Sequence, residues 1–250
     1  MTTRADVTRL SLAMRELVRQ AQGDIASFFY SWGINDPARM RDALLEIVPS
    51  LVNEYGDIAA VAAAEWYEEL RGRAVSGGYS AVLADSVPDA AVQGSVRWAA
   101  GELFGENPTG ALELLNGAVQ RHITYMGRET VRRNVGQDRS RPRFARVPTG
   151  VTTCPFCEML ASRGFVYHSE ASAGALGAAS ESFHDSCDCQ VVPEWDADRA
   201  HIEGYDPDAM YDRYEQAREA WMAQNPGRSP QAGDLAPVLR DLFPDQYTPN

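Results

Sequence analysis

The chain has 250 residues and a formal net charge of −12 at neutral pH. This length can bury a sizeable core in one domain or two, and the acidic balance argues against a general nucleic-acid binder. The chain contains 23 arginines and no lysine, which excludes catalysis by a lysine nucleophile or Schiff base. The first residues lack the apolar segment of a signal peptide, and apolar runs stay short of the ~20 residues that cross a bilayer. We therefore expect a protein that folds in a reducing cytoplasm and does not contact membranes.

Apolar residues recur at steps of three and four in the first part of the chain, which predicts amphipathic helices. The first helix is expected over residues 7–21, closing near Gly23. A second should begin at Asp36 and Pro37, because an aspartate accepts amide hydrogen bonds at a helix start and proline tolerates the first turn. Pro49 is expected to interrupt the chain before the next helix.

The longest apolar stripe of this half runs from Leu51 to Leu70 and should end by the glycine pair at Gly77. Pro88 and Pro108 each open a further helix, the last reaching about Val135. The pattern therefore predicts an N-terminal helical domain over residues 1–136, made of five or six helices.

Residues 137–195 have a different character. Polar residues 137–142 mark a boundary, and residues 144–147, 165–167 and 190–192 are expected to form three short strands. A short helix should follow Cys157 and stop at Gly164. These features predict a small α+β module rich in Cys and His.

Residues 196–250 are expected to form an acidic, helical C-terminal extension. From Glu194 to Asn250 there are twelve Asp and Glu residues against five Arg. One helix should start at Asp206 and pass through Trp221, and a shorter one is expected around Leu239. The whole chain is thus predicted to be mainly α, with a helical domain, a Cys/His-rich module and a helical tail.

All four cysteines lie within the central module. They occur in Cys154-Pro-Phe-Cys157 and, after 26 intervening residues, in His184-Asp-Ser-Cys187-Asp-Cys189. The first pair has the spacing that lets two thiolates reach one tetrahedral ion, and the second cluster offers three further ligands. Five ligands are available for four places, so either Cys187 or Cys189 can complete the set with His184, or four cysteines can form it alone. We expect a structural Zn²⁺, which would stabilise a segment with little apolar core.

Three other interpretations of these residues stay open. Cys154 and Cys157 could form a redox dithiol at a helix N-terminus, although this leaves the second cluster without a role. The four cysteines could instead form two disulfides outside a reducing compartment. A Zn²⁺ with a vacant position could also hydrolyse a bond in nucleic acid or protein, with Glu158, Glu170 or Asp185 as general base, but thiolate-rich shells are usually closed and structural.

The stretch from Arg121 to Arg146 is the basic exception in an acidic chain. It holds eight arginines against Glu129 and Asp138, a local net charge of +6. Such a stretch is either a solvated surface or a contact with phosphates or an acidic protein. The candidate contact residues are Arg128, Arg132, Arg133, Arg139, Arg141, Arg143 and Arg146. His122 lies in the preceding helix, where a lone histidine is more often a surface residue than a catalyst.

The central module resembles the MuF-like minor head proteins of tailed phages, the head morphogenesis family. The resemblance covers about residues 115–195 and rests on three segments, Arg143-Phe-Ala-Arg-Val-Pro148, Cys154-Pro-Phe-Cys157-Glu-Met-Leu-Ala-Ser and Phe183-His184-Asp-Ser-Cys187-Asp-Cys189-Gln-Val-Val-Pro193.

This resemblance implies a non-enzymatic structural protein, made in the host cytoplasm and carried in several copies inside the capsid near the portal. It would act in head assembly, DNA packaging or ejection. Its expected partners are the portal or the major capsid protein, and packaged DNA through the basic stretch. The low overall basicity of the chain departs from a strong DNA-binding role.

Overall fold

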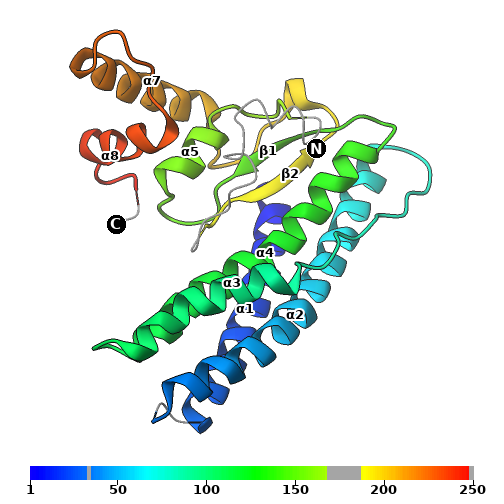
Figure 1. The fold of residues 1–250 in the computed structure, drawn as a ribbon. Helices are drawn as coiled ribbons and strands as arrows, with labels where there is room; N and C mark the ends of the chain where they lie inside the picture. Colours follow the sequence, from blue (N-terminus) through cyan, green and yellow to red (C-terminus); the bar gives the residue numbers. More distant parts are fainter. Residues whose placement is uncertain (33–34, 168–186, 248–250) are drawn as a thin grey trace.

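The computed structural model describes residues 1–32, 35–167 and 187–247. It is mainly helical, as the sequence predicted, and a two-stranded sheet lies beside one end of a long helical block (Figure 1). The described part of this block contains four α-helices and a short 3-10 helix, which are Arg4–Trp32 (α1), Pro37–Ala74 (α2), Asp89–Ala99 (α3), Ala100–Phe104 (η1) and Gly110–Gln137 (α4). Four α-helices are fewer than the five or six expected.

The expected end of the first helix at Gly23 was wrong. α1 continues through this glycine to Trp32. Ile25 and Phe29 extend the buried face of Ala21 by steps of four, with exposed fractions of 0% and 1%. Burial of these side chains stabilises the helix by more than the ~1 kcal/mol that an exposed glycine costs.

The expected interruption at Pro49 was also wrong, since α2 passes through this proline without a break. A proline inside a helix leaves the carbonyl four residues earlier without its amide donor. Here that carbonyl belongs to Leu45, and the side-chain amide of Gln93 from α3 donates to it at 3.5 Å. Packing of Val48 and Val52 in the core, both 0% exposed, keeps the two halves in one helix.

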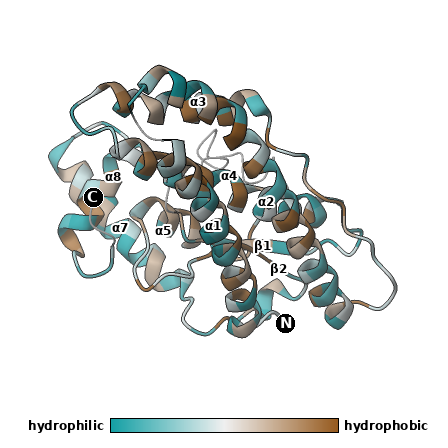
Figure 2. Cartoon of the chain, turned by 90° about the horizontal axis from the view of Figure 1, so that it is seen from below, coloured by the Kyte–Doolittle hydropathy of each residue, from teal (hydrophilic) through white to brown (hydrophobic). Residues whose placement is uncertain are grey.

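The helices of the block enclose one hydrophobic core. Figure 2 shows hydrophobic residues on the sides of α1, α2 and α4 that face one another. Close approach depends on Gly127 of α4, where an added Cβ would lie 3.0 Å from the Met14 Sδ atom and 3.5 Å from the Ala59 carbonyl oxygen. This core continues into the sheet through Phe144, so it crosses the expected boundary at residue 136.

The sheet pairs β1 (Arg143–Val147) with β2 (Gln190–Glu194) in antiparallel register. β2 continues past its expected end at Val192 and includes Pro193, which lies opposite Phe144. The N–H and the carbonyl of Phe144 both bond to Tyr167 on its other side. The N–H that Pro193 lacks is therefore not needed by the ladder. The strand expected at residues 165–167 is reduced to this single bridge at Tyr167 among the described residues.

Three helices complete the described chain, together with a 3-10 turn at Ala197–Arg199 (η3). They are α5 (Pro155–Ala161), α7 (Pro207–Gln224) and α8 (Ala232–Leu242). α7 and α8 pack on α5 around a second apolar cluster that includes Met159, Trp221 and Leu239. No described helix combines the length and the apolar character that a membrane span requires.

Candidate metal centre

The first cysteine pair is placed by the start of α5. Cys154 is the N-cap residue, with Pro155 in the first turn, and its Sγ atom accepts the amide hydrogen of Cys157 at 3.1 Å. A sulfur at this position is stabilised by the unpaired amides and the dipole of the helix start. The local sequence therefore directs both sulfurs toward the same side of the helix.

The second cluster brings two more sulfurs to this point, just before β2. The Sγ atom of Cys187 lies 3.2 Å from that of Cys157 and 3.5 Å from that of Cys189. The three sulfurs all lie within 4.8 Å of one another, and the three residues are at most 4% exposed. Cys154 is half-buried and packs against them. The sequence prediction that the cysteines gather at one place is thus met by the structure.

These distances suit metal ligation better than disulfide bonding. No disulfide joins the four cysteines within the described residues. Thiolates that surround a tetrahedral Zn²⁺ at about 2.3 Å lie roughly 3.8 Å from each other, close to the observed separations. The buried Cys157, Cys187 and Cys189 can therefore hold a metal ion with little movement. His184, the fifth candidate ligand, lies outside the described residues, as do Glu170 and Asp185.

Asp188 joins the two halves of the site, a role that the sequence analysis missed. Its carboxylate accepts hydrogen bonds from the amides of Thr149 and Gly150 at 3.1 and 2.7 Å and from the Thr153 hydroxyl at 2.8 Å. This approach requires a glycine, because a Cβ on Gly150 would lie 2.9 Å from the Asp188 carboxylate. The carboxylate between Cys187 and Cys189 thus anchors the loop that leads into Cys154.

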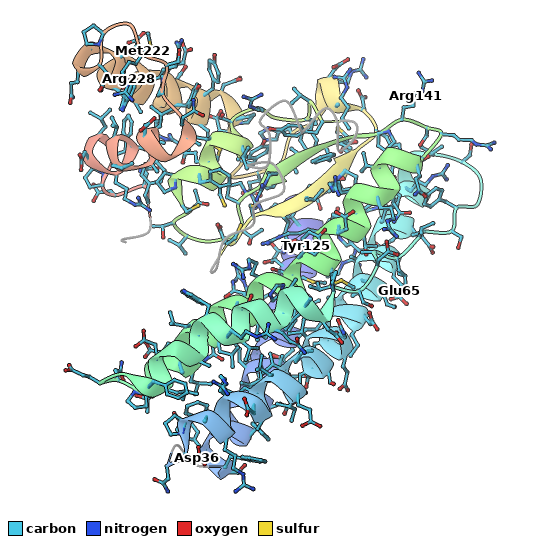
Figure 3. All side chains as sticks on the ribbon, viewed as in Figure 1. Asp36, Glu65, Tyr125, Arg141, Met222 and Arg228 are labelled. Atoms are coloured by element: carbon cyan, nitrogen blue, oxygen red, sulfur yellow. The ribbon has the colours of Figure 1, made fainter. Side chains whose placement is uncertain are left out.

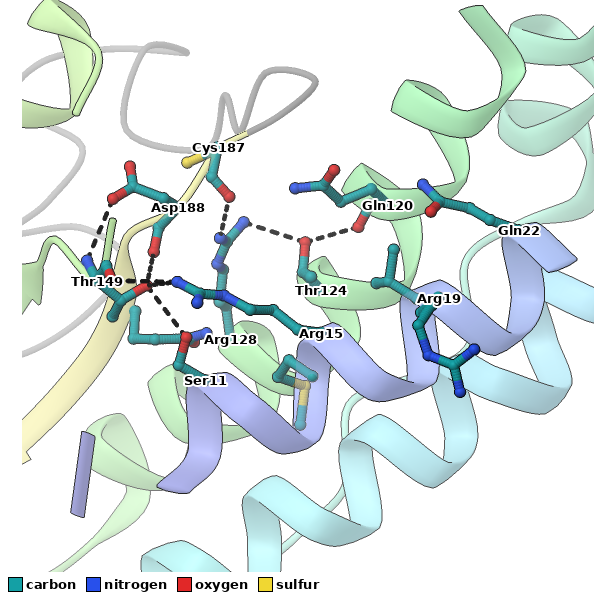
Figure 4. Close-up of a pocket in the computed structure, with 13 residues that line it drawn as sticks. Ser11, Arg15, Arg19, Gln22, Gln120, Thr124, Arg128, Thr149, Cys187 and Asp188 are labelled. Atoms are coloured by element: carbon teal, nitrogen blue, oxygen red, sulfur yellow. Dashed lines mark hydrogen bonds between the residues drawn. The ribbon is translucent and has the colours of Figure 1, made fainter. Parts of the chain in front are cut away.

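The same loop is also tied to α1. The Arg15 guanidinium donates to the Thr149 carbonyl at 3.0 Å, and the Ser11 hydroxyl bonds to the Thr149 hydroxyl at 3.1 Å. Figure 4 shows these residues around a cavity of about 160 Å³ between α1, α4 and the cysteine loop. The helical block and the cysteine module therefore share polar contacts as well as a core.

Two arginines of the basic stretch lie inside the protein at the cysteine cluster. Arg146 of β1 is 4% exposed and donates from Nε and Nη2 to the Cys189 Sγ atom at 3.2 and 2.9 Å. Its Nη2 atom also lies 3.8 Å from the Cys187 Sγ atom. Arg128 of α4 is 2% exposed and donates to the Cys187 carbonyl at 2.8 Å. Their burial removes both from the contact surface that we expected from the sequence.

The remaining candidate arginines lie nearer the surface. Arg132 pairs with Glu129, Arg133 with Asp85, and Arg143 with Asp198. Arg139 and Arg141 are exposed, and none of the ion pairs or side-chain hydrogen bonds in the described part of the chain involves them. Figure 3 shows Arg141 pointing away from the molecule. His122 of α4 is hydrogen-bonded to Ser95 at 3.0 Å.

The cysteines differ in their affinity for protons. Burial alone would raise the pKa of Cys189, but hydrogen bonds from Cys157 and Cys187 and the charge of Arg146 hold it well below its ordinary value. Hydrogen bonds to Cys154, Cys187 and Cys189 raise the pKa of Cys157. For Cys187, the hydrogen bond with Cys157 lowers the pKa. The hydrogen bond with Cys189 and burial outweigh this effect and raise the pKa of Cys187 to about 12. The thiolate form is therefore favoured more at Cys189 than at its neighbours, and a cation would displace protons from those neighbours.

Fold and site together define a mainly helical protein with a small module built around a buried cysteine cluster. The chain belongs to the VG15 protein family, a phage gene family whose model matches residues 1–217. No curated protein matches the chain, and no solved structure matches it. The match covers the helical block, the sheet, the cysteine cluster and most of α7, so the chain is a phage-type protein over most of its length.

Proposed function

We propose that this chain is a non-enzymatic minor head protein of a tailed phage or prophage, carried inside the capsid near the portal. The observation that carries this proposal is membership of a phage family across residues 1–217. The resemblance of the cysteine module to MuF-like proteins adds the head location and a role in head assembly, DNA packaging or ejection. The portal or the major capsid protein is the partner that this role requires.

Particle composition tests this role. The gene is tagged in the phage that encodes it, and full and empty heads are separated and analysed by mass spectrometry. We expect several copies per full head and protection of the protein from added protease until the heads are opened. Recovery only from the host cytosol, with normal heads formed after deletion of the gene, would contradict a virion role.

We further propose that the cysteine cluster holds a structural Zn²⁺. Cys157, Cys187 and Cys189 supply three soft thiolate ligands in a buried position, and Cys154 or His184 supplies the fourth. A full shell of this kind leaves no place for a substrate or an activated water. Glu158, considered above as a general base, is engaged elsewhere, since its carboxylate accepts hydrogen bonds from Arg213 and Tyr247 at 2.7 and 2.8 Å.

Metal analysis of the purified full-length chain tests the centre. One zinc per chain should remain bound through gel filtration, and Cys157→Ser should lose it together with part of the thermal stability. Ser162→Ala is the matched control, because Ser162 also lies at α5 but bonds only to a backbone carbonyl there. Two intact disulfides with no metal in the wild-type protein would rule out the zinc centre.

The proposed contact with packaged DNA rests on the exposed part of the basic stretch, Arg139 and Arg141. Each phosphate contact adds about 0.9 to the slope of log affinity against log salt. Replacing both arginines by glutamine should reduce this slope by about two. A double replacement of the exposed Arg97 and Arg218 changes the net charge equally and should leave the slope unchanged. Equal slopes for the two double variants would eliminate this contact.

A further inference from the structure

Arg146 occupies an unusual place for a charged residue. It is the fourth of the five residues of β1, lies opposite Val191, and only 4% of its surface is exposed. An arginine keeps its charge in a protein, so burial is costly unless anionic groups lie beside it. Its guanidinium meets two sulfurs among the described residues: Nε and Nη2 donate to the Cys189 Sγ atom, and Nη2 also lies 3.8 Å from the Cys187 Sγ atom.

The geometry of this contact is that of a planar fork. Nε and Nη2 of one guanidinium edge reach the same sulfur at 3.2 and 2.9 Å, which fixes the direction of the Cys189 side chain. Cys189 immediately precedes β2, and β2 pairs with the strand that carries Arg146. The ladder between the two strands therefore sets the position of both ends of this contact.

A second arginine acts on the neighbouring ligand through its backbone. Arg128 donates from Nη2 to the Cys187 carbonyl at 2.8 Å and from Nη1 to the Thr124 hydroxyl at 3.2 Å (Figure 4). This bond links α4 of the helical block to the Cys187-Asp-Cys189 turn. Arg146 orients the sulfurs of that turn, whereas Arg128 holds its main chain.

We propose that Arg146 is the positioning residue of the metal centre, orienting Cys189 and Cys187 as thiolate ligands and supplying the positive charge that stabilises them in the protein interior. This inference rests on the metal centre of the proposed function. N–H donors to ligand atoms fix their orientation and tune them, and losing such a donor typically lowers metal affinity 10- to 100-fold. The bonds to Cys189 also occupy sulfur lone pairs, so they protect this thiolate from alkylation.

The test compares Arg146→Met with Arg146→Lys and with the control Arg97→Met, a change at an exposed arginine of α3, in the full-length chain. Zn²⁺ affinity is measured by competition with a chromogenic chelator, and Co²⁺ loading reports thiolate ligation through its sulfur-to-metal absorption bands. We expect Arg146→Met to lose 10- to 100-fold in Zn²⁺ affinity and to weaken the Co²⁺ bands. Arg146→Lys keeps the charge without the fork, so it should fall between Arg146→Met and wild type. Arg97→Met should match wild type.

Alkylation of the Zn²⁺-loaded proteins by iodoacetamide gives a second readout. Cys189 should be modified faster in both Arg146 variants than in the wild-type protein. The inference would be overturned if Arg146→Lys showed wild-type Zn²⁺ affinity, a wild-type Co²⁺ spectrum and wild-type Cys189 reactivity. This result would count even if Arg146→Met fails to fold. Wild-type protein that binds neither cation would instead refute the metal centre itself, so the two failures are distinguishable.

Discussion

Asp138 joins the ends of two long helices, and replacing it by alanine is the sharpest test of the packing described above. The residue follows the last turn of α4, and its side chain is 0% exposed. Its carboxylate accepts hydrogen bonds from Arg71 Nε at 2.9 Å, the Tyr67 hydroxyl at 3.0 Å, and the Ser140 amide and hydroxyl at 2.9 and 2.6 Å. The alanine variant leaves the Arg71 guanidinium, 10% exposed, without this carboxylate.

Removing one partner of a buried ion pair costs about 3–5 kcal/mol. For a chain of this size, each kcal/mol lowers the melting temperature by about 2–4 °C, so Asp138→Ala should melt on the order of 10 °C below wild type. Asp198→Ala is the control, because it breaks an ion pair with Arg143 whose aspartate is 86% exposed. An exposed pair contributes about 0–1 kcal/mol. Circular dichroism melts that place the two variants within about 2 °C of each other would refute the reasoning.

The same carboxylate gives a pH dependence with a defined sign. Burial alone would raise the pKa of Asp138, but hydrogen bonds from Ser140, Arg71 and Tyr67 hold it below its ordinary value. Its stabilisation is therefore complete above the unfolded pKa of about 3.9 and is lost as the pH falls through the lower folded value. Urea denaturation should show the advantage of wild type over Asp138→Asn at pH 7 and a narrowing of this advantage below about pH 4.

Three further contacts are probed by three substitutions, with a fourth substitution as a control, and stability is measured by urea denaturation. Gly127→Val places a branched side chain against Met14 and should cost about 1–3 kcal/mol, whereas Gly136→Ala, in open space on the same helix, should stabilise by about 0.5–1 kcal/mol. Gly150→Ala brings a Cβ within 2.8 Å of a backbone oxygen, so it should destabilise the cysteine loop and lower the Zn²⁺ affinity. An unchanged Zn²⁺ affinity would contradict this prediction. Tyr247→Phe removes a hydrogen bond to the buried Glu158 carboxylate and should lower the free energy of unfolding by about 1.5–3 kcal/mol. A decrease of less than about 0.5 kcal/mol would contradict this prediction.

Local signals in the sequence were sufficient for helix starts and for the cysteine cluster. Asp36 and Asp206 both cap helices as expected, each accepting the amide of the residue three positions later at 3.0 Å. The spacing of the cysteines predicted their convergence for a similar reason, since the first pair is arranged within one turn of α5. For the helix caps and the first cysteine pair the determining contacts lie within a few residues of each other, whereas Cys187 meets Cys157 across 30 residues.

Features that depend on distant contacts were not predictable in this way. Pro49 stays in a helix because core packing outweighs the missing hydrogen bond, and no local pattern shows that packing. The arginines of the basic stretch look alike in sequence, yet Arg146 is buried and Arg141 is exposed. The difference comes from Cys187 and Cys189, which lie 41 and 43 residues further along the chain and reach Arg146 only once β1 and β2 pair.

The position of α5 explains why a cysteine cluster in this module affects more than the module itself. Cys157 and Glu158 are successive residues of this helix, the first in the cluster and the second bonded to Arg213 of α7 and to Tyr247. On the other side of the cluster, Arg128 bonds the Cys187 carbonyl to α4 of the helical block. The proposed ligation at the cysteines would therefore act on one turn of helix between the block and the acidic tail. The proposed structural centre at this junction would suit the proposed role, in which the protein keeps one shape while it is built into a larger particle.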